Sequence, residues 1–278
     1  MGEFLIATVL PYVLTFFFCG LVVTTCIYLP QLGKGFIKLT TPSKILLGVA
    51  LILGAYIRFQ IVPSTQRVLF DEDRYLSYAV SFAKFGKAIS VDIATTNHSI
   101  SGKPDQAVRS TVPVTNALVL YLSGFSESAL YTASKIASVI SIGLIFLLTA
   151  LVFKKYTAAV LAALLMAFFP VVVYWSTSTG LDSYFMFWGL VTMVGAALYT
   201  RMPSVKSLLF FSFSLFLFLC VRVEAIILLP FAFGLIASIR KTDHKKIFTT
   251  SDYRLIAVVT PLILFRIFIS ITVLGQIS

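Results

Sequence analysis

Long apolar runs alternate with polar connections along most of the 278-residue chain. Each run holds close to the twenty residues that an α-helix needs to cross a bilayer core of about 30 Å. The runs are continuously apolar and lack the residue-by-residue alternation of membrane β-barrel strands. The pattern therefore predicts an all-α polytopic membrane protein of about eight transmembrane helices in a single domain, residues 1–278. The runs are 5–30, 44–62, 128–153, 156–175, 183–200, 205–221, 224–239 and 255–275.

Composition and charge agree with a membrane protein. Hydrophobic residues make up 59% of the chain, charged residues 12%, and the mean hydropathy is +0.97, which excludes a soluble globular domain. The net charge of +11 does not indicate a nucleic-acid partner, because the basic residues are spread over short connections, as on the cytoplasmic side of membrane proteins. This places both termini outside, in a multi-pass cell-membrane protein. The basic residues concerned are Lys34, Lys38, Lys44, Lys154, Lys155, Arg201, Lys206, Arg240, Lys241, Lys245, Lys246 and Arg254.

The connection 63–127 is long and patterned, and lies outside in this topology. Tyr75, Tyr78 and Phe82 recur at helical spacing with polar residues between them. This spacing predicts an amphipathic helix on the outer surface. Residues 113–124 are apolar but too short to span at a usual tilt, so we expect a second interfacial or re-entrant helix there.

Acidic residues are rare in this chain and concentrate in the outer connections. Three of the eleven acids are consecutive, at Asp71-Glu72-Asp73, directly before the amphipathic helix, and Asp182 lies in the polar break 176–183. The third outer connection adds Arg222 and Glu224. Carboxylates are costly beside hydrocarbon, so such a cluster usually has a function. Converging on one cleft, these acids would bind a divalent metal ion or deprotonate an acceptor hydroxyl.

Each of these residues also has a simpler structural interpretation. Asp182 is a candidate N-cap of the helix that follows it. Asp73 and Arg74 are expected to be solvated or locally paired, and Arg222 with Glu224 would form a structural ion pair at a tight turn. Outward basic residues would hold a lipid phosphate or attract anionic headgroups in general. They are Arg58, Arg67, Arg74, Lys84, Lys103, Arg109 and Arg222.

Several motifs together resemble the GT-C membrane glycosyltransferases. Asp71-Glu72-Asp73-Arg74-Tyr75 is similar to the D-E-x-x-Y stretch that opens their first outer loop. Later motifs follow in the family's order, and the resemblance covers about residues 44–275, nearest to the aminoarabinose-transferase and protein O-mannosyltransferase branch. These later motifs are Lys103-Pro104 to Val112-Pro113 with Gly124-Phe125, then Leu181-Asp182, and Arg222-Val223-Glu224-Ala225 before Leu229-Pro230.

This resemblance implies an inverting transfer, on the extracytoplasmic face, of a sugar from a polyprenyl- or dolichyl-phosphate donor. The acceptor would be a protein, a lipid or a glycan. Asp71 would be the main catalytic acid, as base or metal ligand, with Glu72 beside it and Asp182 as the second acid and second candidate metal ligand. A divalent metal ion is a candidate cofactor, and membrane lipid is a further partner. The candidate substrate-binding residues are Arg58, Arg74, Tyr75, Lys103, Arg109, Arg222 and Glu224.

The chain also departs from the family pattern. Family members usually continue with further helices after the segment that matches 255–275, and the run 5–30 precedes their usual first helix. The chain therefore resembles their N-terminal transmembrane module. The alternative function is a truncated or non-catalytic GT-C-like scaffold that binds lipid as an accessory protein. A transporter is disfavoured because the spanning runs hold almost no charged residues at mid-membrane depth.

Overall fold

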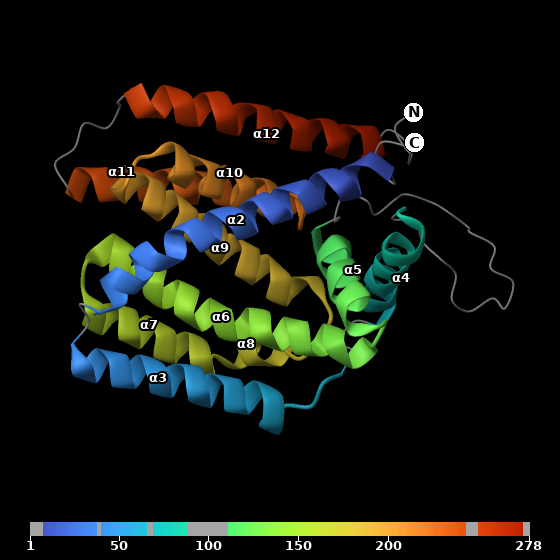
Figure 1. Cartoon of the computed structure of the whole chain (residues 1–278), viewed down its shortest axis with the longest axis horizontal. Coiled ribbons are helices and arrows are strands. Elements are labelled where there is room, and N and C mark those ends of the chain that lie inside the picture. The colour runs from blue at the N-terminus through green and yellow to red at the C-terminus, as the bar shows by residue number, and fades with distance from the viewer. Residues whose placement is uncertain (1–7, 38–39, 66–68, 88–110, 243–249, 275–278) are drawn as a thin grey trace, which may run out of the picture.

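The computed structural model describes residues 8–37, 40–65, 69–87, 111–242 and 250–274, and helices are the only regular elements within these ranges. Figure 1 shows a bundle of long helices with the shorter pair α4 and α5 at one end. The elements are α2 (Leu10–Ile37), α3 (Thr41–Tyr56), the π-helical turn η2 (Ile57–Ile61), α4 (Leu69–Phe85), α5 (Thr111–Ser123), α6 (Glu127–Phe153), α7 (Tyr156–Phe168), α8 (Pro170–Trp175), α9 (Leu181–Arg201), α10 (Val205–Leu219), the 3₁₀ turn η4 (Val223–Leu228), α11 (Leu229–Thr242) and α12 (Thr250–Leu274).

The positions of the helices follow the apolar runs, with local differences; α2, for example, continues to Ile37, beyond the run 5–30. The run 156–175 is split into α7 and α8 at Phe169–Pro170. Pro170 has no N–H to continue the helix, and the residue before a proline is pushed to extended backbone, as Phe169 is, with φ −64° and ψ 114°. The run 224–239 begins as the 3₁₀ turn η4 before α11 starts at Leu229.

The structure confirms an all-helical polytopic membrane protein but not eight full spans. Within the described ranges, four helices are long and apolar enough to cross a bilayer: Leu10–Tyr28, Thr41–Ile61, Glu127–Phe153 and Leu181–Arg201. Four further apolar helices have only 10–17 residues: Thr111–Ser123, Tyr156–Phe168, Val205–Leu219 and Glu224–Ile239.

In the core, α6 packs on α9, α9 packs on α10, and α10 packs on α2. The largest buried side chains there are aromatic, including Trp188, Phe211 and Phe216. Helix α3 packs on α6 and α7 at the other side of the bundle, and α4 packs on α5. Helix α6 starts next to α5, and α7 and α8 run back toward that end (Figure 1). The starts of α6 and α9 therefore both lie at the end of the bundle that carries α4. We call this end the α4 end.

Both the start of α2 and the end of α12 also lie at the α4 end (Figure 1). The connection between α6 and α7, with Lys154 and Lys155, lies at the opposite end. This separation matches the predicted topology, in which both termini share a side with the acidic connections. Which side of a membrane the α4 end faces stays a prediction.

Candidate active site

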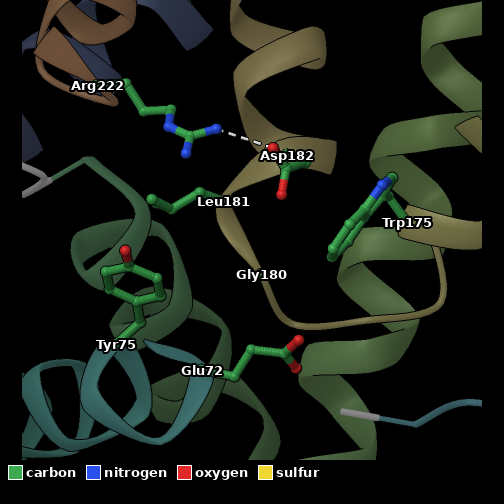
Figure 2. A pocket seen from close by; sticks show the side chains of 7 residues that line it. All are labelled: Glu72, Tyr75, Trp175, Gly180, Leu181, Asp182 and Arg222. Carbon is green, nitrogen blue, oxygen red and sulfur yellow. Dashed lines mark hydrogen bonds and ion pairs between the residues drawn. The ribbon is translucent and has the colours of Figure 1, made fainter. Parts of the chain in front are cut away.

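A small pocket lies at the α4 end between the starts of α4 and α9 (Figure 2). Its volume of about 30 Å³ is room for one or two water molecules. The lining residues come from three stretches of the chain that are far apart in sequence: Glu72, Tyr75, Trp175, Gly180, Leu181, Asp182 and Arg222.

Glu72 enters the pocket from the first turn of α4. Its side chain is 1% exposed, and its Oε2 accepts hydrogen bonds from the backbone N–H of Thr179 at 3.3 Å and from the Thr179 hydroxyl at 3.0 Å. A buried carboxylate requires such donors to offset its lost hydration. A backbone bond from Thr65 N–H to Thr177 O, 3.2 Å long, joins the same two parts of the chain. The first two predicted outer connections are therefore in direct contact.

Asp182 lies in the first turn of α9 and is ion-paired with Arg222. The N-cap of α9 is Gly180, so the interpretation of Asp182 as N-cap is wrong, although a carboxylate in the first turn still suits the helix dipole. Arg222 Nη1 donates to Asp182 Oδ1 at 2.8 Å, as the dashed line in Figure 2 shows. The side chains of Arg222 and Asp182 are 29% and 42% exposed.

Arg222 also has a second, weaker acidic neighbour. Its Nε lies 3.8 Å from Glu224 Oε2, which is too long for a hydrogen bond. The predicted Arg222–Glu224 ion pair therefore exists, but Asp182 is the closer partner. The guanidinium also lies 6.0 Å from the centre of the Phe185 ring, within cation–π range. Arg222 Nε is buried and has no hydrogen-bond partner among the described residues, so a donor remains for an incoming anion.

The remaining predicted site residues fall into two groups. Tyr75 lines the pocket and is 1% exposed, whereas Arg74, although on the same helix, is not among the lining residues that the structure describes. Lys103 and Arg109 lie outside the described residues, as does the side chain of Asp71. The backbone of residue 71 is in the first turn of α4, one helical turn before Tyr75. The catalytic role predicted for it stays a prediction.

Arg58 lies away from the pocket and is completely buried. It donates to Ser138 Oγ at 2.7 Å, Gly54 O at 2.9 Å, Ala167 O at 3.0 Å and Met166 O at 3.3 Å. The last two carbonyls end α7, where Pro170 cannot supply a helical N–H. This setting argues against the predicted contact of Arg58 with substrate, because its donors connect η2, α6 and the end of α7.

Sequence reasoning missed two residues at this site. Trp175 lines the pocket opposite Tyr75 (Figure 2), but a tryptophan at the end of an apolar run is equally typical of a membrane interface. Thr179 holds Glu72, yet in the sequence it is one hydroxyl among four in Ser176–Thr179. No local pattern separates it from its neighbours.

The described residues contain no group of three or more His, Cys, Asp or Glu side chains that could hold a metal ion. Of the carboxylates in the pocket, Glu72 is bonded to Thr179 and Asp182 to Arg222. The donor set that the structure describes does not by itself fit a metal ion. The predicted metal site at Asp71 and Asp182 depends on a side chain outside the described part and stays a prediction.

The family model described as dolichyl-phosphate-mannose-protein mannosyltransferase matches residues 111–269, more than half of the chain. The chain belongs to this mannosyltransferase family. The match confirms the predicted resemblance at the level of a GT-C-type glycosyltransferase family that uses polyprenyl-phosphate-linked sugars, and it confirms an integral membrane protein. The matched residues include Asp182, Arg222 and Glu224, but the match begins after Asp71 and Glu72. No curated protein and no solved structure shows a significant match to the chain.

Proposed function

We propose that this protein transfers a sugar from a polyprenyl- or dolichyl-phosphate donor to an acceptor hydroxyl, at an α4 end that faces the outside of the cell membrane. The observation that carries this proposal is the pocket itself. Two carboxylates and an arginine, Glu72, Asp182 and Arg222, meet there from three connections that are distant in sequence. This constellation lies in a chain of the mannosyltransferase family.

In this proposal, Arg222 binds the phosphate of the donor. A sugar phosphodiester carries one negative charge, the same as the Asp182 carboxylate that pairs with Arg222 at 2.8 Å. An exchange of Asp182 for the phosphate therefore leaves Arg222 paired with one negative charge, as before. The planar guanidinium suits bidentate binding of phosphate oxygens, and its Nε is available to the new partner.

The exchange also releases Asp182. Once Arg222 holds the phosphate, the Asp182 carboxylate loses its partner at 2.8 Å and can accept a hydrogen bond from the reacting groups. We assign the main proton transfer to Asp71, following the family resemblance, and the second carboxylate role to Asp182. The acceptor hydroxyl gives its proton to a carboxylate while its oxygen bonds to the anomeric carbon. The carbon–oxygen bond to phosphate breaks, and the polyprenyl phosphate leaves with its charge held by Arg222. One direct displacement inverts the anomeric centre.

The proposal is tested by sugar release from a radiolabelled polyprenyl-phosphate donor in membranes that contain the purified protein. Asp71→Asn and Asp182→Asn should each lower kcat about a hundredfold or more. Arg222→Ala should lower kcat by roughly 10²–10³-fold and raise the donor KM, and Arg222→Lys should restore only part of the loss. Asp73→Asn is the matched control, because the exposed Asp73 side chain belongs to the same acidic run; its kcat should stay within about twofold.

Full activity of Asp71→Asn would refute the assignment of the base. If Asp71→Asn loses activity while Arg222→Ala keeps the wild-type activity, the phosphate binds elsewhere. If the wild-type protein binds the donor but releases no sugar with any acceptor fraction, the lipid-binding scaffold is the better description.

A further inference from the structure

The contact between Glu72 and Thr179 connects the two segments that carry the candidate catalytic acids. Glu72 directly follows Asp71 on α4, and Thr179 precedes Asp182 by three residues. Both donors of Thr179, its N–H at 3.3 Å and its hydroxyl at 3.0 Å, point to the same oxygen of Glu72. A carboxylate 1% exposed and held in this way is fixed in position.

The loop between α8 and α9 is arranged so that Thr179 is the residue that reaches α4. The hydroxyls of Ser176, Thr177 and Ser178 each turn back to a carbonyl of α8, at 2.7, 3.0 and 3.1 Å. All of these residues are buried. Thr179, in contrast, contacts a residue that lies 107 positions away in the chain.

Gly180 follows Thr179 and lies directly beside both Ser178 and Glu72. A Cβ at this position would lie 3.3 Å from Ser178 Oγ and 3.6 Å from Glu72 Oε1. The Gly180 N–H donates to Ser178 Oγ at 3.2 Å, and Gly180 is the N-cap from which α9 starts. Asp182, in the first turn of that helix, therefore lies only three residues after the contact between Thr179 and Glu72.

We propose that Glu72 and Thr179 are positioning residues that form a latch between α4 and the α8–α9 loop, and that Glu72 transfers no proton. The latch sets the separation between the segment with Asp71 and the segment with Asp182. The expected effect of the latch on catalysis rests on the proposed function, because the latch acts through Asp71 and Asp182. The backbone bond between Thr65 and Thr177, 3.2 Å long, connects the same two parts of the chain and supports the latch from one side.

Variants of Glu72 and Thr179 can show whether Glu72 positions the segments or takes part in the reaction. Glu72→Gln keeps an oxygen that accepts both Thr179 donors but carries no charge and cannot act as a base at neutral pH. Thr179→Val removes the hydroxyl at nearly the same side-chain shape, and Thr179→Ser restores it. We expect Glu72→Ala and Thr179→Val to lower kcat for sugar release roughly 10–100-fold with the donor KM within about threefold.

The conservative variants provide the rescue. Glu72→Gln and Thr179→Ser should keep at least about a third of the wild-type kcat, and the double variant Glu72→Ala/Thr179→Val should be no slower than Glu72→Ala alone, because the two residues act as one unit. If Glu72→Gln is as inactive as Glu72→Ala while Thr179→Val stays near wild type, Glu72 takes part in the chemistry itself and the latch is refuted.

A second measurement does not depend on sugar transfer. The chain has two tryptophans; Trp188 is 2% exposed, whereas Trp175 is partly exposed and lines the pocket beside the loop. Acrylamide quenching of the fluorescence therefore reports mainly on Trp175. It should increase in Thr179→Val and Glu72→Ala and stay at the wild-type value in Glu72→Gln.

The two measurements distinguish failure of the latch from failure of the proposed function. The expected quenching pattern in a protein without sugar-transfer activity would support the latch and contradict the transferase. Unchanged quenching in all variants, with normal activity in Thr179→Val, would contradict the latch and leave the transferase in place.

Discussion

Replacement of Arg58 by methionine should destabilise the protein without a specific effect on donor binding. Methionine keeps the length and apolar stem of the side chain but removes all four hydrogen bonds of the guanidinium. The Gly54 carbonyl retains the N–H of Ile57. The carbonyls of Met166 and Ala167 lose the Arg58 donor next to the Pro170 break.

The size of the effect follows from these two carbonyls. Each buried acceptor left without a donor costs about 1–3 kcal/mol. Relief from burying a charge offsets part of this loss. We therefore expect a net destabilisation of about 3 kcal/mol, which corresponds to a fall in unfolding temperature of roughly 5–12 °C for a chain of this size.

The assay is thermal unfolding of the detergent-solubilised protein, with the donor KM measured beside it below the unfolding temperature. Arg58→Lys keeps the charge but loses the planar fork, so it should recover only part of the stability. Arg254→Met is the control, because Arg254 is exposed on α12, and it should leave the unfolding temperature within about 2 °C. An Arg58→Met protein that unfolds at the wild-type temperature but has a strongly raised donor KM would refute this reasoning and restore Arg58 as a phosphate ligand.

Two further predictions concern packing and topology. Gly195→Ala should destabilise the protein by about 1–3 kcal/mol in the same unfolding assay, because its Cβ would lie 3.0 Å from the backbone Cα of Phe211. Gly143→Ala, which meets nothing within 4 Å, should be neutral or slightly stabilising; equal effects of the two would contradict the packing of α9 on α10. In a variant that lacks the native cysteines, Ser128→Cys should react with a membrane-impermeant maleimide in intact cells and Lys155→Cys only after permeabilisation, since both positions are exposed at opposite ends of the bundle; the reverse pattern would invert the topology.

The sequence predicts most helix positions because long apolar runs constrain the backbone strongly. In lipid, each buried N–H and C=O group requires a partner within its own helix, so runs such as 128–153 form a helix, here Glu127–Phe153. The meeting of the outer connections around one pocket also follows from the alternation of the chain across the bilayer. Asp182 and Arg222 are brought together in this way, although 40 residues separate them.

Contacts that depend on three or more distant segments could not be predicted in the same way. Arg58 looks like an outward cation in the sequence, since nothing near it reveals the carbonyls of Met166 and Ala167 that it binds. Pro170 marks the break that exposes those carbonyls, but it lies within an apolar run, 156–175, whose hydrophobicity predicts one continuous helix. The partner of Glu72 was equally hidden, because Thr179 is one hydroxyl in a run of four and its neighbours bond locally.

Helix α2 lies outside the segment that defines family membership, yet it is part of the same core. Leu14 is fully buried, the Phe17 and Phe216 rings are 4.1 Å apart, and a Cβ on Gly20 would lie 2.6 Å from the Phe213 ring. The segment that matches the family therefore does not form a core of its own in this chain, because α2 packs into the same core. A larger residue at position 20 requires a smaller one at position 213, so we expect α2 and α10 to accept substitutions in compensating pairs and to diverge together.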